Sequence, residues 1–382
     1  MWMKTVACCV ALALLAACSA DLQDAPSALT VSIDSSGVVP VITVSGEAPE
    51  WTLDSLAVIR AEPTVGFSRV RSIALDPRGG VWIADVGENR LSYFGDDGAF
   101  IEDRGRVGSG PGEFRSPYSI AVHNGSLLVH DVGNSRVVHF SLDGGRDTSR
   151  VIGTRLTGDA MRVRMYPNVD GPLLLDRTRD TGPPRAIYSR VGRDEQILVP
   201  AERTMTDSKE CMLGDGIYFF GSPFSPRQHA AAFGAGSVAT EGGEYQLGFF
   251  DRSGVLTRTL RRPVDRDSVT QAEFDAETAD WRKFSAEQST VGCRGTIERY
   301  ALKPAIRALL PDADGRLWVE RRMPGRFVYE LWSGDSLLAR VPAPEREERI
   351  PPAMLGDRLA VVAESPDEGH EVRLYRIRKP GP

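Results

Sequence analysis

The chain has 382 residues, of which 41% are hydrophobic and 26% are charged, and this ordinary globular composition excludes a disordered, collagen-like or polytopic membrane protein. Its formal net charge of −6 argues against nucleic acid as a partner, because phosphate binding needs a basic surface. The 38 glycines and 25 prolines predict a fold with many turns.

Residues 1–18 are predicted to be a targeting segment. They read MWMKTVACCVALALLAAC, in which the cation Lys4 precedes an apolar run that is too short for a permanent membrane span. The last four residues, LAAC, resemble the lipobox of bacterial lipoproteins, which joins a Leu and two small residues to an invariant Cys. This resemblance implies that Cys18 is lipidated and becomes the mature N-terminus. Ordinary signal cleavage near Ala17 or Ala20, with Cys18 incidental, is the alternative.

The residues that follow indicate where the protein resides. Ser19, rather than Asp, follows the Cys, which by the same resemblance implies release to the outer membrane of a Gram-negative cell. Residues 19–37 are polar and are predicted to be a flexible tether. We therefore expect the chain in the cell envelope, anchored by lipid to a membrane that it does not cross and facing the periplasm or the cell surface.

The cysteines agree with export. Only Cys211 and Cys293 lie outside the targeting segment, and a pair in an oxidising compartment predicts a structural disulfide. Two buried free thiols are the alternative. The sequence has no CxxC motif and no cluster of Cys with His, so zinc binding and thiol redox chemistry have little support.

The body of the chain repeats a pattern of short strands. The segments SIALDPRGGVWIADVGENRLSYFGDDG from Ser72 and SIAVHNGSLLVHDVGNSRVVHFSLDG from Ser119 each contain a strand ending at an acid, a turn, and a strand ending at an aromatic residue. Weaker copies extend the series to six units, whose acids are Asp85, Asp131, Asp176, Glu241, Glu320 and Glu364. Four antiparallel strands per unit cannot bury both faces alone. The predicted fold is therefore an all-β six-bladed β-propeller over residues 38–379.

The first two units also resemble a known family. The strings SIALDPRGGVWIADVGENRLSYF and VGSGPGEFRSPYSIAV resemble NHL repeats, and the chain resembles bacterial six-bladed propeller lipoproteins. The match is specific over Phe67 to Gly145 and holds only as a pattern from there to Arg378. WD40 repeats are disfavoured because no GH and WD pair recurs. Seven blades remain an alternative, although two long inserts, at about 204–233 and 263–298, account for the additional length.

One insert is predicted to be helical, over about residues 265–288. Ser268 and Gln271 form a potential capping box at its start. Apolar and small side chains recur on one face at helical spacing, namely Phe274, Thr278, Trp281 and Ser285. This face is expected to pack on the propeller, either as a lid or as a cover for an apolar patch. By the family resemblance, residues 38–59 are expected to add a strand to the last blade and close the ring.

A metal site is one hypothesis for the repeated acids. A ring of carboxylates would attract Ca²⁺ or another divalent cation, but each acid could instead accept N–H bonds in its own turn, as the resemblance to NHL repeats implies. Histidines cluster in the second unit at His123, His130 and His139. NHL-type lyases and related lactonases use such residues around a central metal. The alternative metal set is Asp85, Asp131, Asp176, His123 and His130, with ordinary sheet histidines as the competing interpretation.

The sequence favours a binding module over an enzyme. GxSxG, HExxH, P-loop and Rossmann motifs are absent. We expect a monomer without cofactor that presents loops to a protein, peptide or glycan. The candidate binding residues, expected to be exposed, are Arg104, Arg106, Glu113, Phe114, Arg115 and Tyr118. The alternatives are a purely linking role for this loop and, for the protein, a metal-dependent hydrolase or lyase with His130 or an acid as base.

Overall fold

The structure, a computed structural model, describes most of the chain. The described residues are 28–60, 67–142, 147–151, 165–168, 173–178, 185–190, 196–199, 208–213, 216–287, 297–365 and 369–381. The predicted targeting segment and Cys18 lie outside these residues. Cys293 lies outside them as well, so the predicted pairing with Cys211 stays a prediction.

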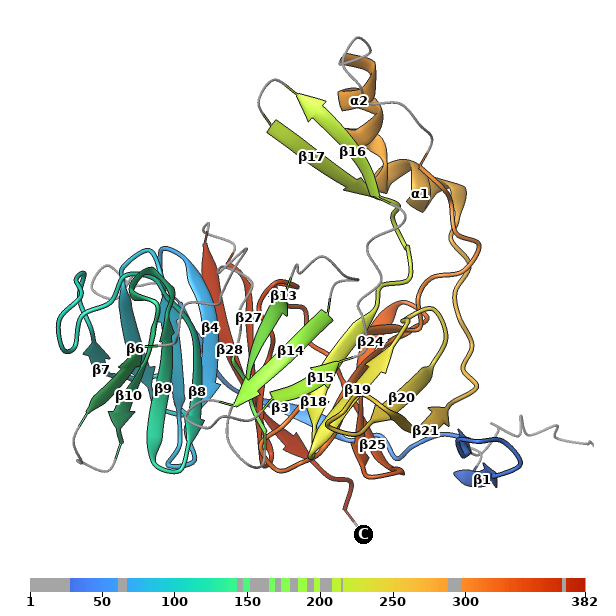
Figure 1. Cartoon of the computed structure of the whole chain (residues 1–382), viewed down its shortest axis with the longest axis horizontal. Coiled ribbons are helices and arrows are strands. Elements are labelled where there is room, and N and C mark those ends of the chain that lie inside the picture. The colour runs from blue at the N-terminus through green and yellow to red at the C-terminus, as the bar shows by residue number, and fades with distance from the viewer. Residues whose placement is uncertain are drawn as a thin grey trace, which may run out of the picture.

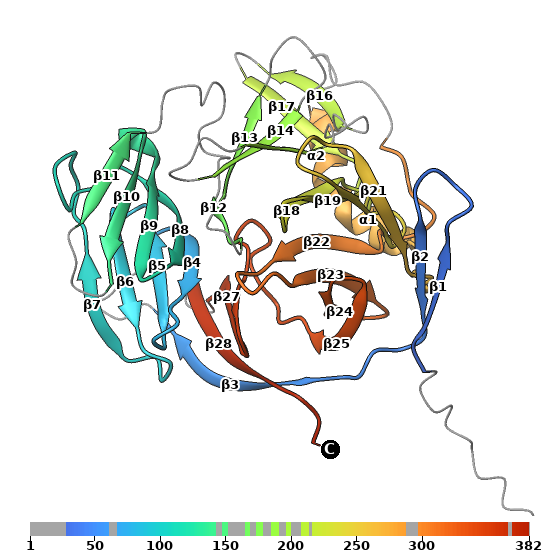
Figure 2. The same cartoon turned by 60° about the horizontal axis from the view of Figure 1, so that its bottom comes forward.

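Six sheets built from sets of four antiparallel strands surround one axis within the described part of the chain (Figures 1 and 2). The first three, blades 1 to 3, follow one another in sequence. Blade 1 holds β4 (Val70–Leu75), β5 (Val81–Asp85), β6 (Arg90–Phe94) and β7 (Phe100–Arg104). Blade 2 holds β8 (Pro117–His123), β9 (Ser126–Asp131), β10 (Arg136–Ser141) and β11 (Thr148–Val151), with the 3-10 turn η1 (Val132–Asn134). Blade 3 holds β12 (Met165–Tyr166), β13 (Leu173–Thr178), β14 (Arg185–Arg190) and β15 (Gln196–Val199).

Blades 4 to 6 complete the ring and confirm the predicted six-bladed β-propeller. Blade 4 holds β18 (His229–Phe233), β19 (Gly236–Thr240), β20 (Gln246–Phe250) and β21 (Leu256–Arg261). Blade 5 holds β22 (Ile306–Pro311), β23 (Leu317–Met323), β24 (Arg326–Ser333) and β25 (Ser336–Pro342). Blade 6 holds β26 (Ala353–Leu355), β27 (Arg358–Glu364) and β28 (His370–Arg378), together with β3 (Thr52–Ile59) from the N-terminal part of the chain.

The N-terminal residues 41–59 follow the outer edges of three blades, and we call this segment the N-terminal strap (Figure 2). A hairpin of β1 (Thr30–Asp34) and β2 (Val41–Ser45) adds β2 in parallel to β21 of blade 4. The next residues hydrogen-bond to Arg340 of blade 5 through Trp51 N and Pro49 O, both at 2.8 Å. β3 then pairs with β28, which closes the ring as expected for residues 38–59.

The repeated Ser-Ile-Ala strings connect neighbouring blades. Ser72 of β4 accepts a hydrogen bond from the backbone N–H of Ile120 in β8 at 3.1 Å. Ser119 of β8 accepts one from Met165 in β12 at 2.9 Å. The same residue of the repeat thus holds the inner strand of one blade to the inner strand of the next, while apolar side chains fill the space between the sheets.

The acids at the ends of β5 and β9 hold turns. Asp85 accepts hydrogen bonds from the backbone N–H groups of Ser68, Arg69 and Gly87 at 2.6–3.0 Å. Asp131 binds the segment that enters β8 in the same way. Each carboxylate ties the end of the second strand to the entrance of the first strand in its own blade. For blades 1 and 2, the structural alternative for these acids is therefore confirmed.

A second repeated acid was not recognised in the sequence. Asp76 accepts a hydrogen bond from the indole Nε1 of Trp82 at 3.1 Å, and Asp312 accepts one from Trp318 at 2.9 Å. Each acid lies six residues before its tryptophan and also receives an arginine from the same turn. The pair fixes the turn between the first and second strands of blades 1 and 5.

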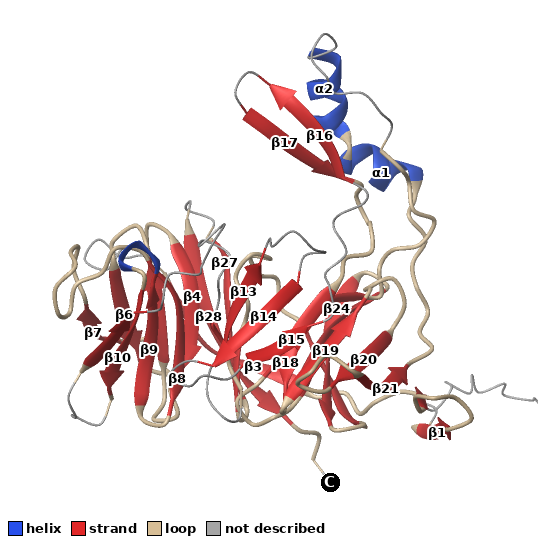
Figure 3. Ribbon diagram, viewed as in Figure 1, coloured by secondary structure: helices blue, strands red, loops and turns tan. Residues whose placement is uncertain are grey.

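The two inserts form a separate projection above the ring (Figure 3). A hairpin of β16 (Ser208–Leu213) and β17 (Gly216–Gly221) lies beside the helices α1 (Gln271–Glu277) and α2 (Ala279–Glu287), away from the blades. The expectation that a helix over about residues 265–288 packs on the propeller was therefore wrong. No helix in the described residues is long and apolar enough to cross a membrane.

The predicted capping box was displaced by two residues. Thr270, not Ser268, caps α1, and its hydroxyl accepts the N–H of Glu273, whose side chain bonds back to the Thr270 N–H. Gln271 instead donates to Asp275 on the surface of the helix. Thr with Glu is the stronger form of this box, because an ionised carboxylate accepts a stronger bond at the positive helix N-terminus.

We predict that Asp85→Asn destabilises the fold by about 2 kcal/mol, because the amide would place N–H groups against buried backbone donors. Urea unfolding would measure the change. Asp251→Asn is the matched control, since Asp251 makes similar bonds in an exposed turn of blade 4. Equal losses in both variants would contradict the buried turn-holding role of Asp85.

Candidate functional site

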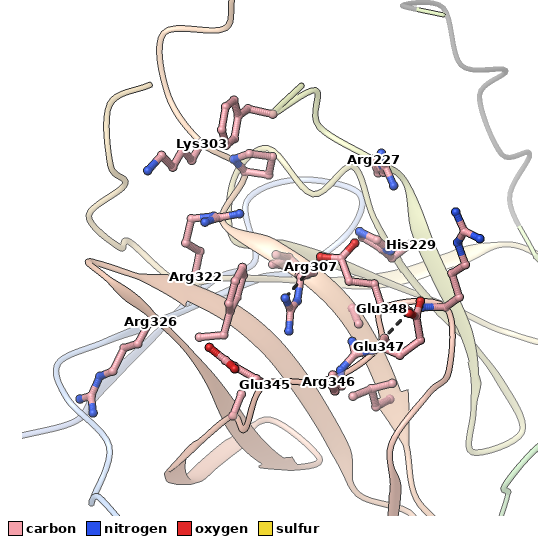
Figure 4. A pocket seen from close by; sticks show the side chains of 18 of the residues that line it. Arg227, His229, Lys303, Arg307, Arg322, Arg326, Glu345, Arg346, Glu347 and Glu348 are labelled. Carbon is pink, nitrogen blue, oxygen red and sulfur yellow. Dashed lines mark hydrogen bonds and ion pairs between the residues drawn. The ribbon is translucent and has the colours of Figure 1, made fainter. Parts of the chain in front are cut away.

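A cleft of about 1700 Å³ opens on the face of the ring from which the two inserts rise. Blades 4 to 6 and the stems of the inserts line it. Its walls come from the entrances of β18 and β22, the turn between β23 and β24, the connection between β25 and β26, and parts of segments 223–228 and 267–277. We refer to this space as the cleft (Figure 4).

Glu320 lies beneath the cleft and is fully buried. The register of the first two strands gives it the position of Ala84 in blade 1, one residue before the position of Asp85, and arginines bind its carboxylate. Arg307 donates to it at 2.5 Å and Arg346 at 2.6 Å. Burial opposes ionisation, but the hydrogen bond from Arg307 and the charge of Arg346 outweigh it and hold the pKa of Glu320 below its ordinary value of 4.5.

Arg346 also shapes the connection between β25 and β26. Its guanidinium group donates to the backbone carbonyls of Glu347, Glu348 and Ile350 at 3.2–3.3 Å. These bonds fold the connection over the end of blade 5 and place Glu347 and Glu348 on the lining of the cleft. A buried ion pair with Glu320 thus sets the course of a surface loop.

The turn between β23 and β24 builds one wall of the cleft. Pro324 presets the backbone and Gly325, with φ 71°, adopts the left-handed conformation that the turn requires. The register then pairs Arg322 with Phe327 across the hairpin. The guanidinium carbons of Arg322 and Arg307 lie 4.5 and 3.6 Å from the centre of the Phe327 ring. We call these three side chains the arginine wall.

Arg322 differs from the cations of the cleft that form ion pairs, such as Lys303, Arg307 and Arg346. Among the described residues its side chain has no hydrogen bond or ion pair, and its contact is with the ring of Phe327. Burial lowers the pKa of Arg322, and the positive charge of Arg307 lowers it further. Three acids counteract this in part, namely Asp267, Glu348 and Glu273. The group remains a cation at neutral pH, since an arginine begins far above that range.

The remaining cleft residues carry both signs of charge. Burial, together with the charge of Arg227, lowers the pKa of His229 to about 4, so this imidazole is neutral at physiological pH. Lys303 pairs with Glu273 at 2.6 Å. Figure 4 shows Arg322, Arg307 and His229 across the middle of the cleft. The acidic side chains that line it are Asp267, Glu273, Glu277, Glu345, Glu347, Glu348 and Glu364.

The predicted binding loop lies elsewhere, between blades 1 and 2, and its residues mostly serve the loop itself. Arg106 pairs with Glu113 at 3.0 Å. Arg136 fastens the loop by donating to its carbonyls. Arg104 lies over the rings of two core aromatics at 5.4 and 5.8 Å. The backbone of Arg115 is held by the acid of blade 2, and Tyr118 is half-buried in β8.

Phe114 corrects the expectation of an exposed aromatic. Its side chain is fully buried and packs edge-on against Phe140 at 5.7 Å in the core between blades 1 and 2. The backbone of the loop turns back on itself, because Phe114 N–H donates to the carbonyl of Arg106 at 2.7 Å and the Gly108 N–H donates to the carbonyl of Phe114. The Gly-Pro-Gly-Glu-Phe string therefore closes the core.

The alternative metal set does not converge in the described residues. Asp85 and Asp131 are engaged in turns, and no group of three or more His, Cys, Asp or Glu side chains is arranged to hold a metal in the described ranges. The side chain of Asp176 lies outside the described residues. His130 is buried and pairs in register with Val137, so it does not oppose His139 directly. His123 is half-buried at the end of β8.

The repeat pattern of the sequence does not mark the arginine wall. The available signal was a departure from the repeat, since the fifth unit has Arg321 where the first two have Asp, with Glu320 before it and the string Arg-Met-Pro-Gly-Arg-Phe after it. The three residues come from consecutive strands of blade 5, but the register and the bulge between Ile306 and Ala308 decide which side chains meet, and residue spacing does not give either.

Comparison with known proteins supports the fold. Residues 69–151, which are blades 1 and 2, match a family model described as "6-bladed beta-propeller". No curated protein matches the chain. The match and the six sheets together make this chain a six-bladed β-propeller.

Several solved structures share the arrangement at low identity. A protein of Bacteroides fragilis NCTC 9343, named as exported, is 12% identical, with 89% of this chain and 100% of that chain covered and a TM-score of 0.42. The calcium-binding protein regucalcin from Agrobacterium tumefaciens is 14% identical, with coverages of 87% and 97% and a TM-score of 0.37. A gluconolactonase from Xanthomonas campestris is 12% identical, with coverages of 85% and 89% and a TM-score of 0.40. These likenesses concern the fold alone.

We predict that Glu320→Gln destabilises the protein by about 3–5 kcal/mol at neutral pH, because two arginines lose their buried counter-charge. The folded-state pKa of Glu320 is lowered, so its contribution is present above about pH 4.5 and is lost as pH falls through the lowered value. Urea unfolding of both proteins at neutral and acidic pH would show the difference shrinking in acid. Glu348→Gln, which removes an exposed partner of Arg307 at 3.4 Å, should change stability by less than about 1 kcal/mol.

Proposed function

We propose that this propeller is a non-catalytic binding module of the cell envelope, that it is held on a membrane by lipid at Cys18, and that the cleft over blades 4 to 6 takes up a segment of a protein or peptide. The observation that carries this proposal is the cleft itself. It combines about 1700 Å³ of accessible space with charged side chains on rigid strands and short turns.

The fold suits binding because the blades fix the side chains of the cleft. Arg307 comes from β22, Arg322 from β23 and Phe327 from β24, and the ion pairs beneath them are buried. Groups held by packing lose little conformational entropy when a ligand arrives. A rigid sheet that presents variable connections is a common way to build such a site.

The mixed charge of the cleft favours a peptide over a polyanionic glycan. The arginine wall attracts an anionic group, but Glu345, Glu347 and Glu348 lie on the same lining. A polymer with a negative charge on every unit would meet these carboxylates and be repelled. A peptide can present one acid to the arginines and neutral or basic side chains to the glutamates.

The competing function, a metal-dependent hydrolase or lyase with an axial cation, has less support. It required at least three of Asp85, Asp131, Asp176, His123 and His130 to meet at one point. Two of these, Asp85 and Asp131, use their carboxylates to bind backbone N–H groups of their own turns. The cleft provides the better candidate because its charged groups face open space.

Site-specific photo-crosslinking in cells would test the binding role. A crosslinking amino acid in place of Glu345, on the cleft, should give a covalent adduct with an envelope protein or peptide. The matched control places it at Arg252, an exposed residue in the turn between β20 and β21 on the opposite face. No adduct at Glu345, or the same adduct at both positions, would overturn the proposal.

The anchor is tested separately. Cys18→Ser should move the protein from the membrane to the soluble fraction of lysed cells and abolish incorporation of labelled fatty acid. Cys9→Ser, which leaves the lipobox string intact, should remain in the membrane fraction. A Cys18→Ser protein that stays on the membrane with its label would show that the anchor lies elsewhere.

A further inference from the structure

We propose that the arginine wall, formed by Arg307, Phe327 and Arg322, is the subsite that receives a carboxylate group of the bound peptide. This inference rests on the proposed function, because it assigns ligand chemistry to one part of the same cleft. It names an acidic residue of the peptide, or its C-terminal carboxylate, as the group that is recognised.

Arg322 is the cation in the wall that is available to a ligand. Arg346 and Arg307 are paired with the buried Glu320, Lys303 is paired with Glu273, and Arg326 is paired with Glu50 at 3.2 Å. The side chain of Arg322 has no hydrogen bond or ion pair among the described residues. Its donors therefore have no partner within the described part of the chain.

The geometry of the wall suits a planar two-oxygen anion. A guanidinium group presents parallel N–H donors that match the two oxygens of a carboxylate. Contact with the Phe327 ring, at 4.5 Å from the guanidinium carbon of Arg322, limits the orientations that this group can take. The register of the β23 and β24 hairpin fixes the ring itself. The wall is thus organised before a ligand binds.

The electrostatic environment adds a driving force for anion binding. Burial and the neighbouring charge of Arg307 both lower the pKa of Arg322, so the folded protein holds two cations close together at a cost. Glu320 balances Arg307 from below, but Arg322 has no such counter-charge in contact. A carboxylate placed at the wall would relieve this repulsion, while more acids in the same ligand would meet Glu345 and Glu348.

A random peptide display library, panned on the full chain purified in mild detergent, provides the probe for a test. Peptides that are enriched would be synthesised, and their affinity would be measured by fluorescence anisotropy. We expect the enriched peptides to contain Asp or Glu, or to need a free C-terminus. Replacing that acid by its amide should weaken binding about tenfold or more, and Arg322→Gln should do the same.

Two variants control for charge and folding. Arg252→Gln removes an exposed positive charge on the opposite face of the ring, outside the cleft, and it should leave peptide affinity within about twofold of wild type. Arg322→Lys keeps the positive charge but lacks the parallel N–H donors of a guanidinium group, so its affinity for the peptide should lie between those of Arg322→Gln and wild type. Thermal unfolding of each variant would confirm that the fold is intact. In the Arg322→Gln protein, the acidic peptide and its amide should bind equally.

The outcomes separate this inference from the proposed function. If substitutions of cleft residues weaken the affinity of no enriched peptide, the proposal that the cleft binds peptides is wrong. If peptides bind in the cleft but the amide binds as well as the acid, or Arg322→Gln binds the peptide as tightly as Arg252→Gln does, the carboxylate subsite alone is wrong. If oligogalacturonate binds as tightly as the enriched peptides or more tightly, and Arg322→Gln weakens its binding too, the subsite recognises an anionic glycan and the peptide assignment is wrong.

Discussion

The constraint on which this structure depends is that every sheet has two edges with unpaired backbone groups and two faces to bury. A four-stranded blade cannot meet both demands alone. Radial packing buries the faces between neighbours, and serines such as Ser72 and Ser119 hold the backbone of one inner strand to the next. The outer edges of blades 4 to 6 are covered by the N-terminal strap, whose β3 also completes blade 6. Closure of the ring therefore uses residues from both ends of the chain.

Two neighbouring positions near the end of the second strand serve different purposes in different blades. In blades 1 and 2 the last residue of this strand is an Asp that binds backbone N–H groups of its own turn. In blade 5 the register places Arg321 at that position and Glu320 one residue before it, where blade 1 has Ala84. Glu320 binds Arg307 and Arg346 and forms a buried ion cluster beneath the cleft. These departures from the repeat make one part of an otherwise repetitive ring distinct.

The cleft and the loop between blades 1 and 2 differ in the direction of their arginine and phenylalanine side chains. Both contain arginines and a phenylalanine. In the loop, Phe114 is in the core and the arginines bind neighbouring groups of the loop or cover core aromatics. In the cleft, Phe327 supports two guanidinium groups at its surface, and that of Arg322 has no hydrogen bond or ion pair among the described residues. The composition is similar, but the direction of the side chains differs.

The sequence by itself determined the fold class, favoured six blades over seven and located the turn-holding acids of blades 1 and 2, because strand alternation and turn residues are local signals that recur with each blade. It also indicated that residues 38–59 close the ring. Only the tertiary structure decided that Phe114 is buried, that the helical insert stands beside a hairpin away from the blades, and that Arg307, Arg322 and Phe327 form one wall. Those facts depend on which residues of different strands and inserts meet and in which direction they point, and the spacing of residues along a chain carries no record of either.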